Sequence, residues 1–277
     1  MPRRQSWYRL RNGRTVIGHY CMDWLAYGFM SILGLLIGSF ANVVIYRLPR
    51  GESLARPRSH CIACNRQLTF YENVPVLSWA VQKGRCRGCG VQISVRYPIT
   101  ELAVALAFEY SLWLVGLHML LIYVVVGDIA AIVASEIDLE LRRIPNLLIV
   151  AALAICLVSL AVQLVVFGES YFVEKFLVGM VAGSLSLYVI ALMSRGGMGM
   201  GDVKLVGLLG GIVGLLGYRY LFVMLLAAFG LGSAYGIMLI VTKRASRKSS
   251  VPFGPFIGGG YLLSQLAYHF IPHVLGL

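Results

Sequence analysis

Apolar segments of membrane length recur along the chain and constrain its fold more than any other feature. They lie near residues 24–46, 100–117, 119–137, 145–167, 171–193, 203–217, 220–241 and 255–275. About 20 apolar residues cross a bilayer as one helix, because a backbone in lipid must satisfy its own hydrogen bonds. The sequence therefore predicts an all-α fold: a polytopic integral membrane protein with about eight transmembrane helices.

The composition agrees with a membrane location. Hydrophobic residues make up 58% of the chain and charged residues 13%, whereas a soluble domain carries about 25% charged residues. The net charge is +12, and basic residues are typical of the cytoplasmic loops of membrane proteins. Because no soluble basic domain is present, we expect membrane lipid as a partner and no nucleic acid.

The distribution of lysine and arginine predicts the orientation. If residues 47–98 lie in the cytoplasm and the helices alternate, seventeen basic residues fall inside and seven outside. Five of those seven lie in a basic N-terminal tail, residues 1–23, before the first transmembrane helix, 24–46. Met22 is a natural start, so we expect residues 1–21 to be either an extension or the result of a misassigned start. Residues 99–277 form the membrane core.

The sixth apolar segment is short and rich in glycine. Its glycines are Gly207, Gly210, Gly211, Gly214 and Gly217. Small residues at this spacing allow helices to approach closely in lipid. We therefore expect these glycines to form a packing face.

Six carboxylates lie in or beside the apolar segments: Glu101, Glu109, Asp128, Glu136, Asp138 and Asp202. Ordinary structural roles are open to most of them. Glu101 is placed to pair with Arg96 near a helix start. Glu109 and Asp128 are expected to hydrogen-bond within the bundle, and Glu136 and Glu140 to flank a helix end in water.

Asp202 stands between two apolar segments, where a charge costs free energy and indicates a functional site. The topology places Asp138 at the same depth, near the cytoplasmic end of another helix. Two carboxyls in one site can hydrolyse a peptide bond: one stays protonated and polarises the carbonyl, while the other activates water. Two alternatives stay open: Asp202 as a helix N-cap, and a proton-coupled transporter, although no internal repeat supports the latter.

Two cysteine pairs lie in the only sizeable polar segment, residues 47–98. Cys61-x-x-Cys64 is followed, after 21 residues, by Cys86-x-x-Cys89. Four thiolates at this spacing are typical of a zinc ribbon, and a closed four-cysteine site is structural because it leaves no open position. Redox or disulfide roles are the alternative, disfavoured in the cytoplasm. We expect a small cytoplasmic zinc-binding module.

These features together resemble the type IV prepilin peptidases, a family of GxGD aspartic proteases, over nearly the whole chain. The matching motifs are GSFANVVIYRLP at 38–49, the two cysteine pairs, NVPVLSW at 73–79, ISVRYPITE at 93–101, ID at 137–138 with IPN at 144–146, GMGDVK at 199–204, and PFGPF at 252–256. GxGD alone is weak, but this ordered set is specific.

The resemblance implies that Asp138 and Asp202 are the catalytic residues, without any cofactor for peptide cleavage. Supporting or substrate-binding residues would be Gly199, Gly201, Lys204, Glu101, Pro145 and Asn146. The substrates would be prepilins or pseudopilins, cleaved at the cytoplasmic face of the bacterial inner membrane. Many members of the family also methylate the new N-terminus with S-adenosylmethionine, for which the sequence shows no separate methyl-donor motif.

The chain departs from the family pattern at three places. The first cysteine pair lacks the common proline, Glu140 stands where many members have a second aspartate, and Asn146 replaces an aspartate. A presenilin-like protease that cuts within helices shares GxGD and is a further alternative. It would require a Pro-Ala-Leu motif, which is absent.

Overall fold

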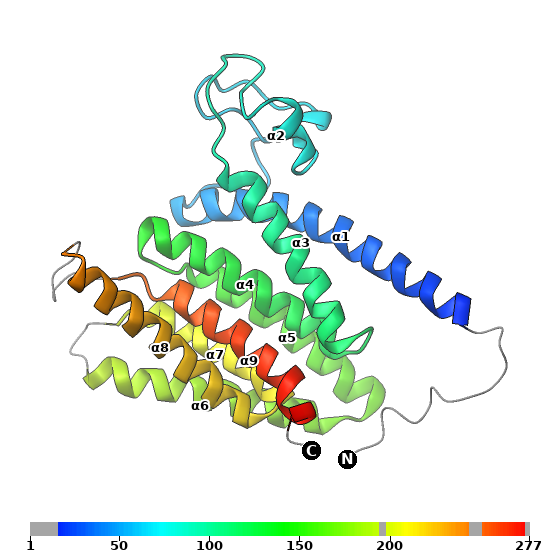
Figure 1. The fold of residues 1–277 in the computed structure, drawn as a ribbon, viewed down its shortest axis with the longest axis vertical. Coiled ribbons are helices and arrows are strands. Elements are labelled where there is room, and N and C mark those ends of the chain that lie inside the picture. Colours follow the sequence, from blue (N-terminus) through cyan, green and yellow to red (C-terminus); the bar gives the residue numbers. More distant parts are fainter. Residues whose placement is uncertain (1–15, 194–197, 244–250, 275–277) are drawn as a thin grey trace.

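The computed structural model describes residues 16–193, 198–243 and 251–274. Within these residues the chain forms eight long helices and no β-strand, and the helices assemble into one bundle (Figure 1). They are α1 (Val16–Arg47), α3 (Arg96–Val115), α4 (Leu120–Leu141), α5 (Asn146–Phe167), α6 (Ser170–Met193), α7 (Met200–Leu216), α8 (Tyr218–Val241) and α9 (Gly254–Val274). Most of the predicted basic tail, residues 1–15, lies outside the described part.

The all-α membrane fold is confirmed. Each long helix matches one predicted apolar segment to within a few residues, apart from α1, which begins at Val16 and not near residue 24. Six of these helices are long and apolar enough to cross a membrane. The two others are α9 and α7, and α7 has 17 residues. The number of eight crossings therefore stays a prediction.

Helix α7 lies at the centre of the bundle, in contact with α4, α5, α6, α8 and α9. All its side chains from Leu205 to Leu216 are buried. Helix α6 approaches it through small residues, as the glycine spacing predicted. A Cβ added at Gly214 would lie only 2.5 Å from the carbonyl oxygen of Lys175. Glycine is therefore required where the two backbones meet.

Helices α1 and α3 pack together at one edge of the bundle. Here too a glycine brings the backbones close: a Cβ at Gly38 would lie 2.7 Å from the Cα of Glu101. The segment between these helices, residues 48–95, forms a separate module at their ends (Figure 1, top). It holds two short 3-10 turns, η2 (Leu48–Arg50) and η3 (Phe70–Asn73), and a five-residue helix, α2 (Leu77–Val81).

Candidate functional site

Asp138 lies in the last turn of α4, where the side chain is 5% exposed. Helix α4 ends three residues later, at Leu141, because Arg142 adopts a left-handed conformation with φ 53° and its N–H donates to the Asp138 carbonyl. The Asp138 carboxylate accepts a 2.8 Å hydrogen bond from the backbone N–H of Gly254, at the start of α9. A Cβ at Gly254 would lie 3.0 Å from that carboxylate. The glycine of the PFGPF segment thus gives the carboxylate a close backbone donor.

Asp202 lies in the first turn of α7 and is 9% exposed. The expectation that it caps this helix is wrong: the N-cap is Gly199, whose carbonyl accepts the Asp202 N–H at 3.1 Å. Asp202 is instead the third helical residue, where unsatisfied N–H groups and the helix dipole favour a negative charge. Gly199 has its Cα beside the Asp202 carboxylate, with an added Cβ only 3.4 Å from Oδ2.

The two aspartates come together from opposite ends of their helices. Asp138 ends α4 and Asp202 begins α7, two helices that are in contact. Ile144, just after α4, packs on Gly201 of α7, so the helix ends that carry the two nearly buried carboxyls lie together. Two carboxyls that share a buried site cannot both ionise easily, so such a pair tends to share a proton. Sharing a proton is what hydrolysis by paired aspartates requires.

Four of the predicted supporting residues lie where α5 and α7 begin. Lys204 donates a 2.8 Å hydrogen bond to the side-chain oxygen of Asn146, the first residue of α5. Pro145 is the N-cap of α5. Gly201 packs against Ile144, 3.0 Å from the position of an added Cβ. The contacts tie the α4–α5 connection to the first turn of α7, directly beside the aspartates.

Glu101 lies elsewhere. Its carboxylate accepts a 2.7 Å hydrogen bond from the N–H of Val76, in the module, and it packs against Gly38 of α1. The expected pairing of Glu101 with Arg96 is wrong, because this backbone donor occupies the carboxylate while Arg96 turns to α4. Glu101 thus joins the module to the bundle.

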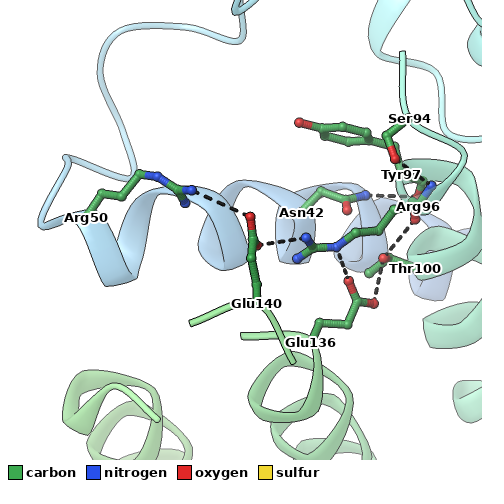
Figure 2. Close-up of polar contacts among 8 residues, drawn as sticks. All are labelled: Asn42, Arg50, Ser94, Arg96, Tyr97, Thr100, Glu136 and Glu140. Atoms are coloured by element: carbon green, nitrogen blue, oxygen red, sulfur yellow. Dashed lines mark hydrogen bonds and ion pairs between the residues drawn. The ribbon is translucent and has the colours of Figure 1, made fainter. Parts of the chain in front are cut away.

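A charged network that the sequence did not predict joins α3 and η2, the turn after α1, to α4 (Figure 2). Arg96 pairs with Glu136 and Glu140, at 2.8 Å each, and Arg50 approaches Glu140 at 3.6 Å. Thr100 donates a 2.6 Å hydrogen bond to Glu136. The sequence signal was the i, i+4 spacing of the two glutamates, which places them on one helix face. They flank Asp138 in sequence, so the network holds the turn of α4 that carries it.

The four cysteines of the module converge. Their sulfur atoms all lie within 4.8 Å of one another, and no disulfide joins them. The sulfur atoms of Cys61 and Cys89 are 3.8 Å apart, and those of Cys64 and Cys86 are 4.0 Å apart. A tetrahedral zinc with bonds of about 2.3 Å would place its sulfurs about 3.8 Å apart. The donor set and its spacing therefore fit such an ion. The adjacent His60 turns away, with Nδ1 3.1 Å from the Arg58 carbonyl.

Asp128 lies three turns of α4 away from the pair and is 1% exposed. It accepts hydrogen bonds from Ser111 of α3 at 2.6 Å and from Gln265 of α9 at 2.9 Å. Glu109 accepts one from Ser31 of α1. The expectation that Glu109 and Asp128 hydrogen-bond within the bundle is confirmed. These carboxylates connect helices within the membrane and lie apart from the aspartate pair.

Two family models match this chain. The bacterial peptidase A24 N-terminal domain covers residues 32–115, which contain most of α1, the module and α3. The type IV leader peptidase family covers residues 125–237, which contain both Asp138 and Asp202. The boundary between the two matches falls at the connection between α3 and α4.

Curated relatives match most of the chain. A prepilin leader peptidase/N-methyltransferase of Bacillus subtilis (strain 168) is 35% identical over 85% of this chain and 92% of the relative. A protein of the same name from Aeromonas salmonicida (strain A449) is 33% identical, over 85% and 89%. A type 4 prepilin-like proteins leader peptide-processing enzyme of Escherichia coli O78:H11 is 35% identical, over 82% and 88%. No solved structure matches the chain.

Proposed function

Because the chain belongs to the type IV leader peptidase family, we propose that it is an aspartic endopeptidase that removes the N-terminal leader of type IV prepilins or pseudopilins. The observation that carries the proposal is that the end of α4, with Asp138, packs against the start of α7, with Asp202. The names of the relatives supply the substrate class.

The proposed mechanism uses the pair as one unit with a shared proton. The ionised carboxyl removes a proton from water, which attacks the scissile carbonyl, while the protonated carboxyl donates a hydrogen bond to the carbonyl oxygen. The proton then passes to the leaving amine. The Gly254 N–H holds one oxygen of Asp138 in place, and the α7 N-terminus stabilises negative charge at Asp202. No cofactor takes part in these steps.

Small residues leave room for an extended substrate beside the pair. Gly199 and Gly201 have no side chain at the start of α7, so a substrate backbone can approach the Asp202 carboxylate there. Lys204 and Asn146, which bond each other nearby, offer polar groups to such a substrate. We propose that these four residues line the cleavage site and that Glu101 has a positioning role.

The proposed location of the site is the cytoplasmic face of the bacterial inner membrane. Asp138 lies at the same end of α4 as Glu136 and Glu140, which pair with Arg96 at the start of α3 and so with the base of the module. The basic residues gather on this side of the predicted topology. Leader peptides of proteins still anchored in the membrane would reach the pair from this side.

We propose zinc as the ion that the cysteine cluster holds. Cys61, Cys64, Cys86 and Cys89 would bind it as thiolates and fill all four positions of a tetrahedral ion. Its role would be to fold the module, because a closed site has no place for water or substrate. The relatives are also named N-methyltransferases, and we propose a second activity on the new N-terminus with S-adenosylmethionine.

One experiment tests both activities. The full chain in lipid is mixed with a model prepilin and a methyl-labelled donor, and leader loss and label transfer are scored together. Asp138→Asn and Asp202→Asn should each lower cleavage by a factor of about 1,000 or more, since an amide cannot share the proton. The control is Asp128→Asn, another buried aspartate of α4, which should keep cleavage. Normal cleavage by either pair variant would refute the aspartic mechanism, and absent leader loss in the wild type would refute the peptidase.

A further inference from the structure

Helix α2 in the module presents an apolar face outward. Leu77, Ala80 and Val81, at helical spacing i, i+3 and i+4, are all exposed, Leu77 by 65% and Val81 by 71%. The opposite face holds Trp79, which packs on Gly84 and donates a 3.1 Å hydrogen bond to the Ile93 carbonyl. A surface helix normally turns its apolar stripe inward. This helix has apolar residues on both faces, and no other part of the module packs over Leu77, Ala80 and Val81 on the outer face.

Two aromatic residues continue the same surface. Phe70 and Tyr71 of η3, the turn that contacts α2, are 90% and 59% exposed. We call Phe70, Tyr71, Leu77, Ala80 and Val81 the apolar edge. Removing a large apolar side chain from water is favourable in proportion to the apolar area buried. An edge with three such residues left in water is therefore a strong indication of a contact surface.

The apolar edge adjoins the part of the molecule that lipid covers. Figure 1 shows the module at one side of the bundle, beside the ends of α1 and α3, and not over the bundle centre. Helix α2 lies on the side of the module along which α1 and α3 extend. Ile99 and Leu106 of α3 are 57% and 63% exposed, on a helix long and apolar enough to span a membrane. The apolar edge therefore belongs to a module attached at the end of such a helix.

The positive charge of the module favours binding to an anionic surface. Residues 48–95 carry seven basic and two acidic side chains, so a positive charge remains even after four thiolates bind a zinc ion. Three exposed basic residues, Lys83, Arg85 and Arg87, follow α2 directly. The guanidinium of Arg87 lies over the Tyr71 ring, 5.4 Å from its centroid. Basic residues beside exposed aromatic and aliphatic ones are the composition that binds anionic lipid headgroups.

We propose that the apolar edge inserts into the headgroup region of the bilayer on the module side, with Lys83, Arg85 and Arg87 on anionic lipid phosphates. The module then lies on the membrane beside the bundle, held by lipid as well as by its two connections to α1 and α3. This inference does not depend on the proposed peptidase activity, because it rests on the surface of the module and its place beside the membrane helices.

Photo-crosslinking of the full chain in nanodiscs tests the contact. A photoreactive residue replaces Leu77 or Val81, and, as matched control, Ile62, an aliphatic residue of the first cysteine pair that is 58% exposed outside the edge. Lipid adducts should be about tenfold more frequent at 77 and 81 than at 62, and should increase when phosphatidylglycerol is added to phosphatidylcholine. Equal yields at the three positions would overturn the edge as a lipid contact. Adducts to an added prepilin peptide in preference to lipid would show a protein-binding surface instead.

A second measurement uses serine variants whose metal content confirms a folded module. Leu77→Ser with Val81→Ser should raise hydrogen exchange of residues 70–82 about tenfold in nanodiscs with phosphatidylglycerol, and leave it unchanged in detergent. Ile62→Ser should change neither. An increase of the same size in detergent would mean that the two residues stabilise the module internally, and the proposal would fail.

Discussion

In α7, twelve consecutive residues from Leu205 to Leu216 are buried, whereas in the 48 residues of the module only Glu72, Gly84 and Cys86 are. The bundle is stabilised by close packing, and its central helix is covered by five others. The module has no apolar core, and its buried residues are a carboxylate, a glycine and a thiol. One chain therefore combines two parts with different sources of stability. A change at the metal site should destabilise the module alone, and a change in helix packing should destabilise the bundle alone.

The largest effect is expected from the metal site. Cys61→Ser, or treatment with a strong chelator, should unfold the module, because structural zinc in small domains contributes about 10 kcal/mol or more. The bundle should keep its helicity and its melting temperature. Limited proteolysis of residues 48–95 beside circular dichroism measures both. Cys156→Ser is the control, since this buried cysteine belongs to α5 and should leave the module protected. A module that stays protease-resistant without metal would contradict the claim that metal binding, and not an apolar core, stabilises it.

A change in helix packing should destabilise the bundle and leave the module intact. Gly214→Ala places a methyl group against the Lys175 carbonyl, so the α6–α7 contact must open, at a cost of about 2 kcal/mol. The control is Gly230→Ala in α8, where an added Cβ meets nothing within 4 Å. It should be neutral or slightly stabilising, because alanine favours helix. Unfolding in detergent measures both variants. Equal stability of the two would contradict the role assigned to the α6–α7 contact.

Where the two parts meet, the expected effect is smaller. Arg96→Glu should destabilise the junction by about 1 kcal/mol, because Arg96 is partly exposed and solvent screens its pairs with Glu136 and Glu140. Arg96→Lys should keep most of the stability. Adding Glu140→Arg to Arg96→Glu should restore part of the loss. Hydrogen exchange at the end of α4, with kcat and KM for leader cleavage, is the measurement. A failure of the double variant to recover would show that shape, and not charge, matters at this junction.

The smallest effect is expected inside the module. The pKa of Glu72 is lowered to about 2, first by the hydrogen bond from Arg66 and then by the Thr69 N–H. The ionised Glu72 carboxylate therefore stabilises the folded module. This stabilisation is fully present above about pH 4.5 and is lost as the pH falls toward 2, because the folded state prefers the ionised form. Glu72→Gln, which keeps part of the hydrogen bonding, should therefore destabilise the metal-loaded module at pH 7 by about 0.5 kcal/mol. Urea titration of module proteolysis measures this, with the exposed Glu52→Gln as neutral control.

Sequence reasoning located the helices well because lipid imposes one requirement on every crossing segment, namely an apolar run that forms its own hydrogen bonds. It also singled out Asp138 and Asp202, since charges are rare between such runs, and their catalytic role stays a prediction. It assigned Glu101 to the wrong partner, because the Val76 N–H that binds it comes from a loop whose path has no periodic pattern. It did not identify the Gly254 donor to Asp138, which lies 116 residues further along the chain.

The central position of α7 also affects how the protein is made. A helix that touches other helices on all sides need not be apolar enough to enter the bilayer alone, and α7 is short, rich in glycine and begins with Asp202 and Lys204. Its free energy of insertion therefore depends on neighbours already in the membrane, above all α6, which precedes it and packs closely on it. The aspartate of α7 would then be assembled into place late, after the helices that shield it from lipid during biosynthesis.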